Sequence, residues 1–265
     1  MTATFTLHRG YAPLLVSVPH CGTELPDEVR AALVPRAHAT EDADWHLDRL
    51  YAFVCERGAS LLVPRYARYA IDLNRPPDDT PMYPGASNTG LAPTTFFDGT
   101  PLYRDGQAPS AAAIASRRQR WWQPYHDALA AELAALRERH GFAVLLDGHS
   151  IRSRIPWLFE GKLPDFNLGT AGGASCAPSL REAATRALTV PGYTLAVDGR
   201  FKGGYITRRY GRPAERAHAV QLEMCQSTYM DEAPPFALDE ARAAQLAPRL
   251  RALVDALLDW RPDAR

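Results

Sequence analysis

The sequence has few cysteines, no excess of either charge and no long apolar run, and each shortage narrows the possible classes of protein. Its four cysteines have no C-x-x-C spacing, which favours reduced thiols in a cytosol. Lys plus Arg equals Asp plus Glu at 30 each, so the zero net charge gives no reason to expect a nucleic-acid or membrane partner. The apolar run "PLLVSVP" is too short for a signal peptide or a membrane span. We expect a cytoplasmic protein, either a monomer or a small homo-oligomer.

Short apolar runs alternate with stretches of helical spacing along the chain. A chain of 265 residues is near the size at which one core stops growing, so we expect a single domain over 1–265. Runs rich in Val, Leu and Ile predict buried strands at 14–18, 60–64, 69–73, 142–147 and 218–224. Helices are predicted over 42–59, over 110–141 with a kink or split at Pro124, from Ser179 onward, and over 238–260. This alternation predicts an α/β fold, a three-layer sandwich around a mixed, mostly parallel sheet.

Two segments match neither pattern. Residues 74–109 and 152–177 are dense in Pro, Gly and Asn, and loops of this length are uncommon unless they are functional or disordered. Their aromatic residues argue against disorder. We interpret both as ordered walls of a ligand pocket.

Polar side chains follow the predicted strands at the point where each strand ends. The runs deliver His20, then Asp147 and His149, then Glu223, and a fourth run delivers Asp72, Asn74 and Arg75. Ligand sites of open α/β sheets lie beyond the carboxyl ends of the strands. If these strands are parallel neighbours, their side chains converge at one edge, with Gly148 letting the chain turn there.

Two histidines and one carboxylate are the ligand set of a catalytic zinc site with an open position for water. The third ligand is either Glu24 or Asp44, and the residues alone do not decide between them. Asp42 is expected to cap the following helix. Asp147 is placed to orient the imidazole of His149, and Glu223 is placed to act as a general base.

Each of these residues also has an ordinary structural explanation. Any one histidine is more often a surface or hydrogen-bonded residue than a ligand, and Glu223 alone could be a salt-bridged strand end. Arg75 could pair with Asp72 or Asp78, and Asp44 could cap a helix. The joint pattern favours a site, because independent accidents would not all fall at strand ends.

Nine motifs together resemble one known family, the N-formylglutamate amidohydrolases, over roughly residues 5–232. They are "SVPHCGTELP", "DADWHLDRLYAF", "IDLNRPPDD", "TGLAPTTFFDG", "WWQPYHDAL", "LLDGHSIRS", "LPDFNLGT", "GRFKGGYITRRYG" and "AVQLEMCQSTYM". This family is in turn similar to the zinc carboxypeptidase-like hydrolases. The resemblance implies a zinc-exopeptidase-like fold.

The resemblance also implies roles for individual residues. In the carboxypeptidase-like hydrolases a Glu follows the first metal-binding His by three residues, whereas Glu24 follows His20 by four. The motif "DADWH" therefore favours Asp44, and the implied ligands are His20, Asp44 and His149, with Glu24 in reserve. The implied metal is one Zn²⁺, although Fe, Co or Mn also suits such ligands.

The implied reaction is hydrolysis of N-formyl-L-glutamate to formate and L-glutamate, the last step of a histidine degradation route. Glu223 would take a proton from the attacking water and return it to the leaving amine. A substrate with two carboxylates calls for guanidinium partners. By resemblance Asn74 and Arg75 face a substrate carboxylate, and the further candidates are Arg152, Arg154, Lys202 and the pair Arg208–Arg209.

Three other interpretations compete. The first is a metal-dependent hydrolase of another N-acyl amino acid or of a peptidoglycan-type amide. The second is a cysteine amidase that uses Cys21 beside His20, although adjacent strand residues point to opposite faces. The third is a non-catalytic protein that binds an acidic metabolite.

Overall fold

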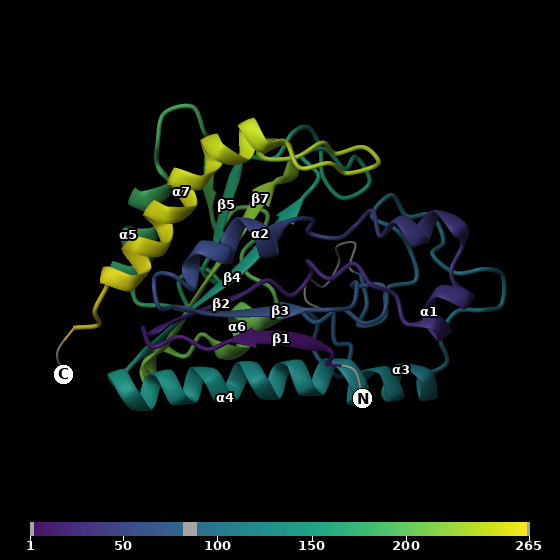
Figure 1. The fold of residues 1–265 in the computed structure, drawn as a ribbon, viewed down its shortest axis with the longest axis horizontal. Helices are drawn as coiled ribbons and strands as arrows, with labels where there is room; N and C mark the ends of the chain where they lie inside the picture. Colours follow the sequence, from purple (N-terminus) through teal and green to yellow (C-terminus); the bar gives the residue numbers. More distant parts are fainter. Residues whose placement is uncertain (1–2, 82–88, 264–265) are drawn as a thin grey trace.

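A seven-stranded β-sheet forms the centre of the computed structural model, which describes residues 3–81 and 89–263 (Figure 1). Its strands are β1 (Phe5–His8), β2 (Leu14–Ser17), β3 (Ser60–Pro64), β4 (Ala143–Ile151), β5 (Phe166–Gly169), β6 (Leu195–Val197) and β7 (Ala217–Cys225). They lie in the order β1-β3-β2-β4-β7-β5-β6. β1 is antiparallel to β3 and β5 to β7, and the other four pairings are parallel, which confirms a mixed, mostly parallel sheet.

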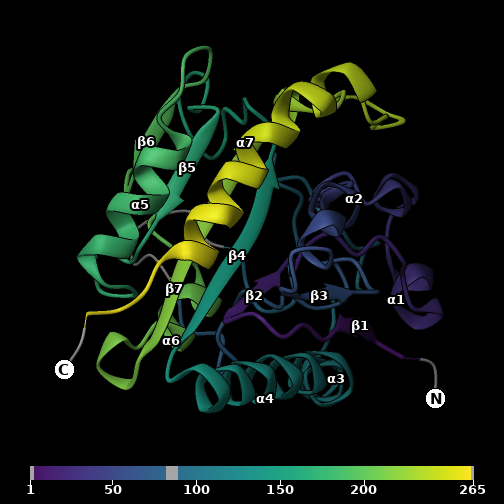
Figure 2. The ribbon, with the colours of Figure 1, turned by 60° about the vertical axis from the view of Figure 1, so that its left-hand side comes forward.

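Helices cover both faces of the sheet, which confirms the α/β class with a helical layer on each side (Figure 2). One face carries α2 (Leu47–Tyr51), α5 (Pro178–Leu188) and α7 (Glu240–Asp259). The other carries α3 (Ala111–Arg117), α4 (Gln123–His140), α6 (Tyr205–Tyr210) and, toward one end, α1 (Asp27–Ala32). Short turns of helix complete the list: η1 (Pro35–Ala39), η2 (Ala52–Val54), the π-helical η3 (Arg118–Trp122), η4 (Pro213–Glu215) and η5 (Gln226–Thr228).

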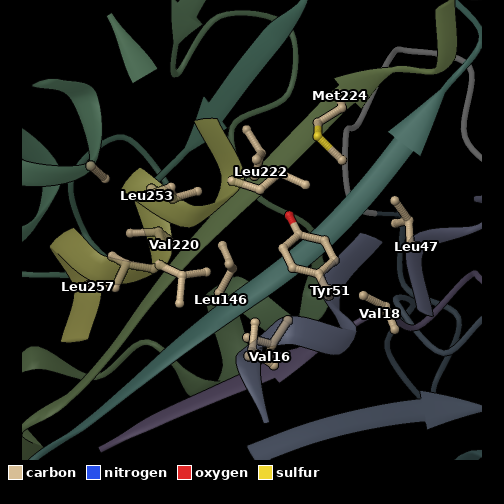
Figure 3. Packing of buried hydrophobic residues seen from close by; sticks show 14 of the residues in the cluster. Val16, Val18, Leu47, Tyr51, Leu146, Val220, Leu222, Met224, Leu253 and Leu257 are labelled. Carbon is tan, nitrogen blue, oxygen red and sulfur yellow. The ribbon is translucent and has the colours of Figure 1, made fainter. Parts of the chain in front are cut away.

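Alternating side chains of the central strands build two separate cores. Val144 and Leu146 of β4 pack with α7 on one face, and Leu145 packs with α4 on the other. This alternation follows from the two-residue period of a strand. Figure 3 shows side chains of the first core, among them Leu146 of β4, Val220 of β7 and Leu257 of α7. Because apolar residues cover both faces, the central strands are rigid supports for whatever their ends carry.

The predicted strand at 69–73 is wrong. Its residues form a turn in which Ala70 N donates to Ala67 O, while Asp72 N donates to Leu91 O in a distant loop. The apolar side chains in this run are buried in the second core without any strand pairing. Burial and strand pairing are separate properties, and the composition of the run reported only the first.

Other predicted elements need smaller corrections. The helix expected over 42–59 begins at Leu47 and continues only through η2 to Val54. The segment 152–177, expected as a loop, contains strand β5, and the prediction also missed β1 and β6. The chain is not split at Pro124, because helical backbone continues from α3 through the π-helical turn η3 into α4, and this proline lies in the first turn of α4. In the segment 74–109, the described residues 74–81 and 89–109 form turns and isolated bridges, and 82–88 lie outside the described residues.

Among the described residues, no helix combines the length and the apolar content that crossing a bilayer requires.

Candidate active site

Three adjacent parallel strands bring the predicted polar residues to one edge of the sheet. In the register of β2 and β4, Ser17 is opposite Asp147, and β2 then leads directly to His20. In the register of β4 and β7, His149 is opposite Glu223. The convergence expected from sequence therefore follows from strand pairing. Gly148 does not turn the chain as expected, because β4 continues to Ile151; a Cβ at this position would lie 3.0 Å from the Tyr51 ring.

His20, Asp44 and His149 form a buried group whose potential ligand atoms lie within 4.8 Å of one another, so these residues can hold a metal ion. Asp44 Oδ2 is 3.2 Å from His149 Nδ1 and 3.8 Å from His20 Nδ1. Asp44 lies in a turn before α2 rather than at the start of a helix. Its N–H donates to His20 O at 3.0 Å, and its Oδ2 accepts from Ser150 N at 3.0 Å. These bonds fix the carboxylate between the two histidines.

The Nε2 atoms of both histidines contact carboxylates. His20 Nε2 lies 2.6 Å from Asp72 Oδ1, and His149 Nε2 lies 3.1 Å from Asp147 Oδ1. A proton on His20 Nε2 leaves its Nδ1 lone pair free for a metal, which is the usual arrangement of ligating histidines. His149 Nε2 has both an acceptor, Asp147 Oδ1, and a donor, Asn74 Nδ2, beside it; a proton directed at Asp147 leaves Nδ1 free in the same way. Asp147 Oδ2 accepts in turn from Thr207 Oγ1 at 2.9 Å.

The electrostatic environment of His149 favours positive charge. Burial alone would lower the pKa of His149, but the carboxylates of Asp147, Asp44 and Glu223 raise it well above its usual value. A site that attracts a proton this strongly also suits a cation. Two imidazole nitrogens and one carboxylate are donors that divalent zinc accepts, so the residues present fit the metal.

Two acidic residues that follow His20 in the sequence, Glu24 and Asp42, are not part of the metal group. The side chain of Glu24 is 55% exposed and pairs with Arg65 at 2.7 Å, so the structure does not bring it to the metal group. The prediction that Asp42 caps the following helix is wrong, because the N-cap position of α2 is His46. Asp42 instead accepts from Tyr69 OH at 2.9 Å and pairs with Arg152 at 2.9 Å.

Glu223 is buried beside the metal group. Burial is the main cause that raises its pKa to about 8; His149 opposes this shift and Asp44 adds to it. A carboxyl group with a pKa close to neutrality suits general acid–base chemistry, because it both accepts and returns a proton.

A small pocket opens over these residues and encloses about 210 Å³. This volume is below the roughly 300–1,000 Å³ of pockets for drug-sized ligands, so it suits a small metabolite. Its lining includes the three metal-group residues, Glu223, the polar residues Arg68, Asn74, Arg75, Thr89, Ser150, Arg200 and Gln221, and the apolar residues Phe97, Ile151, Leu158 and Phe201.

The structure brings only some of the predicted substrate-binding residues to this pocket. Asn74 and Arg75 line it, and Asn74 Nδ2 lies 2.9 Å from His149 Nε2. The remaining predicted cations are not among its described lining residues: Arg152 pairs with Asp42, Arg154, Lys202 and Arg208 are exposed, and Arg209 is exposed on α6.

Sequence reasoning missed two pocket arginines, Arg68 and Arg200. Arg68 is buried, pairs with Asp72 at 2.5 Å, and places Nη1 at 3.4 Å from His20 Nδ1. The stretch "RYARYAIDLNR" contains three arginines in similar sequence surroundings. Only the i,i+4 spacing to Asp72 distinguishes Arg68 from the other two. Arg200 lies in the "GRFKGG" motif, where the adjacent Lys202 was chosen instead.

Cys21 is buried in the first hydrophobic core and is not among the described residues of the pocket. Burial is the main cause that raises the pKa of its thiol well above the usual value, with smaller contributions from Asp48 and Asp44. A thiol that resists ionisation is a poor nucleophile, which argues against a cysteine amidase.

Comparison with known proteins identifies the relatives of this chain. The sequence profile of the N-formylglutamate amidohydrolase family matches residues 12–230. The chain belongs to the N-formylglutamate amidohydrolase family. This membership confirms the family inferred from the nine motifs.

Named members of the N-formylglutamate amidohydrolase family resemble the chain along nearly its whole length. N-formylglutamate deformylase of Pseudomonas putida is 50% identical over 98% of this chain and 97% of its own length. The enzyme of the same name from Pseudomonas aeruginosa is 51% identical over 98% of both chains. The crystal structure of N-formylglutamate amidohydrolase from Ralstonia eutropha JMP134 has a TM-score of 0.83 at 30% identity, covering 96% of this chain and 98% of that one.

Proposed function

We propose that this protein hydrolyses N-formyl-L-glutamate to formate and L-glutamate. The observation that carries the proposal is Glu223, a buried carboxyl group with a raised pKa that is paired in register with His149 of the metal group. The pocket above them is small and contains arginines, which suits a small acidic substrate. The names of the two curated relatives support the same reaction.

We further propose that the metal is Zn²⁺, held by His20 Nδ1, His149 Nδ1 and Asp44 Oδ2. When bound there, a zinc ion supplies Lewis acidity, which lowers the pKa of water toward neutrality and polarises a carbonyl group. Asp72 and Asp147 hold the two imidazoles in the required tautomer through their contacts with the Nε2 atoms.

Glu223 moves the proton in this reaction. Its carboxylate removes a proton from the water that attacks the formyl carbon, and it returns that proton to the amine nitrogen as the C–N bond breaks. Formate and glutamate then leave, and Glu223 is again ionised. Burial keeps the pKa of this group close to the working pH, so both transfers are accessible.

Arg68 and Arg75 supply positive charge around the reacting amide. Arg68 is buried beside His20, where its guanidinium can stabilise negative charge that develops on the formyl oxygen. Arg75 donates to Thr89 O and to Thr89 Oγ1, both at 2.7 Å, so the side chain is held in one orientation. We assign Arg75, with the neighbouring Asn74, to the α-carboxylate of the substrate.

A formate-release assay on purified protein tests the reaction, with metal analysis on the same preparation. We expect stoichiometric zinc, rapid turnover of N-formyl-L-glutamate, and much slower turnover of N-acetyl- and N-succinyl-L-glutamate. Full activity after chelation and dialysis would contradict the metal assignment. A preference for either larger acyl group would contradict the proposed substrate.

A further inference from the structure

The three pocket arginines differ in whether their charge is already balanced. Arg68 forms an ion pair with Asp72. Arg75 donates only to neutral oxygens, and Arg200 forms no ion pair within residues 3–81 and 89–263. Two arginines that line the pocket, the half-buried Arg75 and the exposed Arg200, therefore have no ion-pair partner in the part of the chain that the structure describes.

A substrate with two negative charges needs cations in the pocket, because an unpaired charge is costly to remove from water. The pocket lining also includes the carboxyl group of Asp44. A dianionic substrate has one carboxylate next to the reacting amide and a second at the end of its side chain. Arg75 adjoins Asn74, which contacts His149, so its place is near the reacting amide. The second carboxylate needs another cation.

The backbone that carries Arg200 is anchored on both sides. Before it, Asp198 accepts from Thr170 N at 2.7 Å and from Thr170 Oγ1 at 2.6 Å. After it, Lys202 O accepts from Ala171 N at 2.6 Å. The segment is thus fixed to the end of β5, and little conformational freedom remains to be lost when a ligand binds.

The guanidinium of Arg200 is held by an aromatic ring rather than by polar groups. Its Cζ lies 5.5 Å from the centroid of Phe159, a contact that orients the cation while leaving its N–H donors free. Phe159 belongs to a small hydrophobic cluster, and Leu158 and Phe201 pack against that cluster and line the pocket. Methylene groups suit this wall, and a carboxylate suits the arginine beside it.

We infer that Arg200 binds the side-chain carboxylate of the substrate and so selects glutamate over neutral amino acids. This inference rests on the proposed deformylase function. Arg200 is a specificity-determining residue that contacts the substrate away from the bond that breaks. Because that contact is equally available before and during the reaction, its loss raises KM more than it lowers kcat.

Paired substrates provide the test. We compare kcat/KM for N-formyl-L-glutamate and N-formyl-L-glutamine in the wild type and in Arg200→Gln. The variant should lower the glutamate value by about 10- to 100-fold, the size of a lost charge-assisted hydrogen bond, and leave the glutamine value unchanged. Since both substrates are measured on one preparation, a loss of folded protein would lower both values equally and cancel in their ratio.

Matched variants separate this role from general effects. Arg75→Gln should lower both values together, because both substrates have the α-carboxylate. Arg200→Lys should recover part of the glutamate preference. Arg186→Gln, at a position on α5 whose side chain is 73% exposed, should change neither value.

The outcomes distinguish the two proposals. If the wild type releases formate from neither substrate, the proposed function fails. If it hydrolyses N-formyl-L-glutamate but Arg200→Gln keeps the wild-type ratio of the two values, the role of Arg200 is overturned. Selective loss of the glutamate substrate in Arg75→Gln would also overturn it, because the two arginines would then have exchanged roles.

Discussion

The Nε2 atom of His20 lies 2.6 Å from a carboxylate oxygen of Asp72, a residue 52 positions later in the chain. The other oxygen of Asp72 pairs with Arg68 at 2.5 Å. One buried carboxylate thus contacts a proposed metal ligand and balances the cation beside it. Burial would raise the pKa of Asp72, but Arg68 and His20 outweigh burial and hold it well below its usual value.

Replacement of Asp72 should weaken metal binding although Asp72 is not itself a ligand. In Asp72→Asn the imidazole loses its anionic partner, and we expect metal affinity to fall by about 10- to 100-fold. Competition with a chromophoric chelator measures the dissociation constant. Asp78→Asn, at a fully exposed position, is the matched control and should bind metal as the wild type does. Equal affinity in both variants would contradict the orienting role.

Glu223→Gln should retain the metal and lose the reaction. An amide cannot accept the proton of water, so kcat should fall by about 10²- to 10⁴-fold. Turnover of N-formyl-L-glutamate is measured beside zinc content by mass spectrometry. Near wild-type turnover in a variant with full zinc would show that Glu223 is not the base.

Variants of Asp44 and Glu24 should differ in zinc content, because Asp44 and not Glu24 is the proposed third ligand. Asp44→Asn removes a charge between the two histidines, so zinc content should fall below stoichiometric after dialysis. Glu24→Gln removes only an exposed pair with Arg65, which contributes about 0–1 kcal/mol to stability. Its zinc content should match that of the wild type, and zinc loss in Glu24→Gln alone would reverse the assignment.

His126 should make the fold less stable in acid. Burial lowers the pKa of His126 to about 4, with a hydrogen bond to Leu73 O opposing that shift. Because the folded value is below the unfolded value of about 6.5, the unfolded chain binds the proton first. Stability from this group is complete above about pH 6.5 and is lost as the pH falls toward 4, by about 2 kcal/mol between pH 7 and pH 5.

Urea unfolding at both pH values checks this expectation. His126→Gln has no proton to gain, so its free energy of unfolding should decrease less between pH 7 and pH 5 than that of the wild type. The difference between the two decreases in the free energy of unfolding is due to His126 alone. His218, whose pKa is also lowered to about 4, mainly by burial, is present in both proteins. An identical decrease in the two proteins would contradict the prediction.

The sequence allowed the metal group to be predicted because two of its members lie at or just beyond the ends of buried strands. Runs of Val and Leu identify such strands, and parallel pairing then brings His20 and His149 together. Asp44 needed the family resemblance, since a turn delivers it and no periodicity marks that turn. Its position depends on hydrogen bonds to His20 O and Ser150 N, which exist only in the folded chain.

Arg68 and Arg200 could not be selected from sequence for a related reason. Both lie outside regular strands. Other arginines and lysines lie close to them in the sequence, and these residues differ only in their surroundings in the folded chain. Their roles depend on whether a carboxylate lies nearby, as Asp72 does for Arg68. The strand at 69–73 was predicted wrongly because buried turns can be as apolar as buried strands.

His149 and Glu223 are register partners on neighbouring strands, so the spacing between the proposed metal ligand and the proposed base is set by the hydrogen-bonded sheet. Arg200, by contrast, is carried by the connection between β6 and α6. In the proposed assignment, the reacting groups and the residue that selects the substrate thus lie in parts of the chain that can change independently. Exchanging the segment around Arg200 is therefore a route to deformylases for other amino acids, with the hydrolytic machinery left intact.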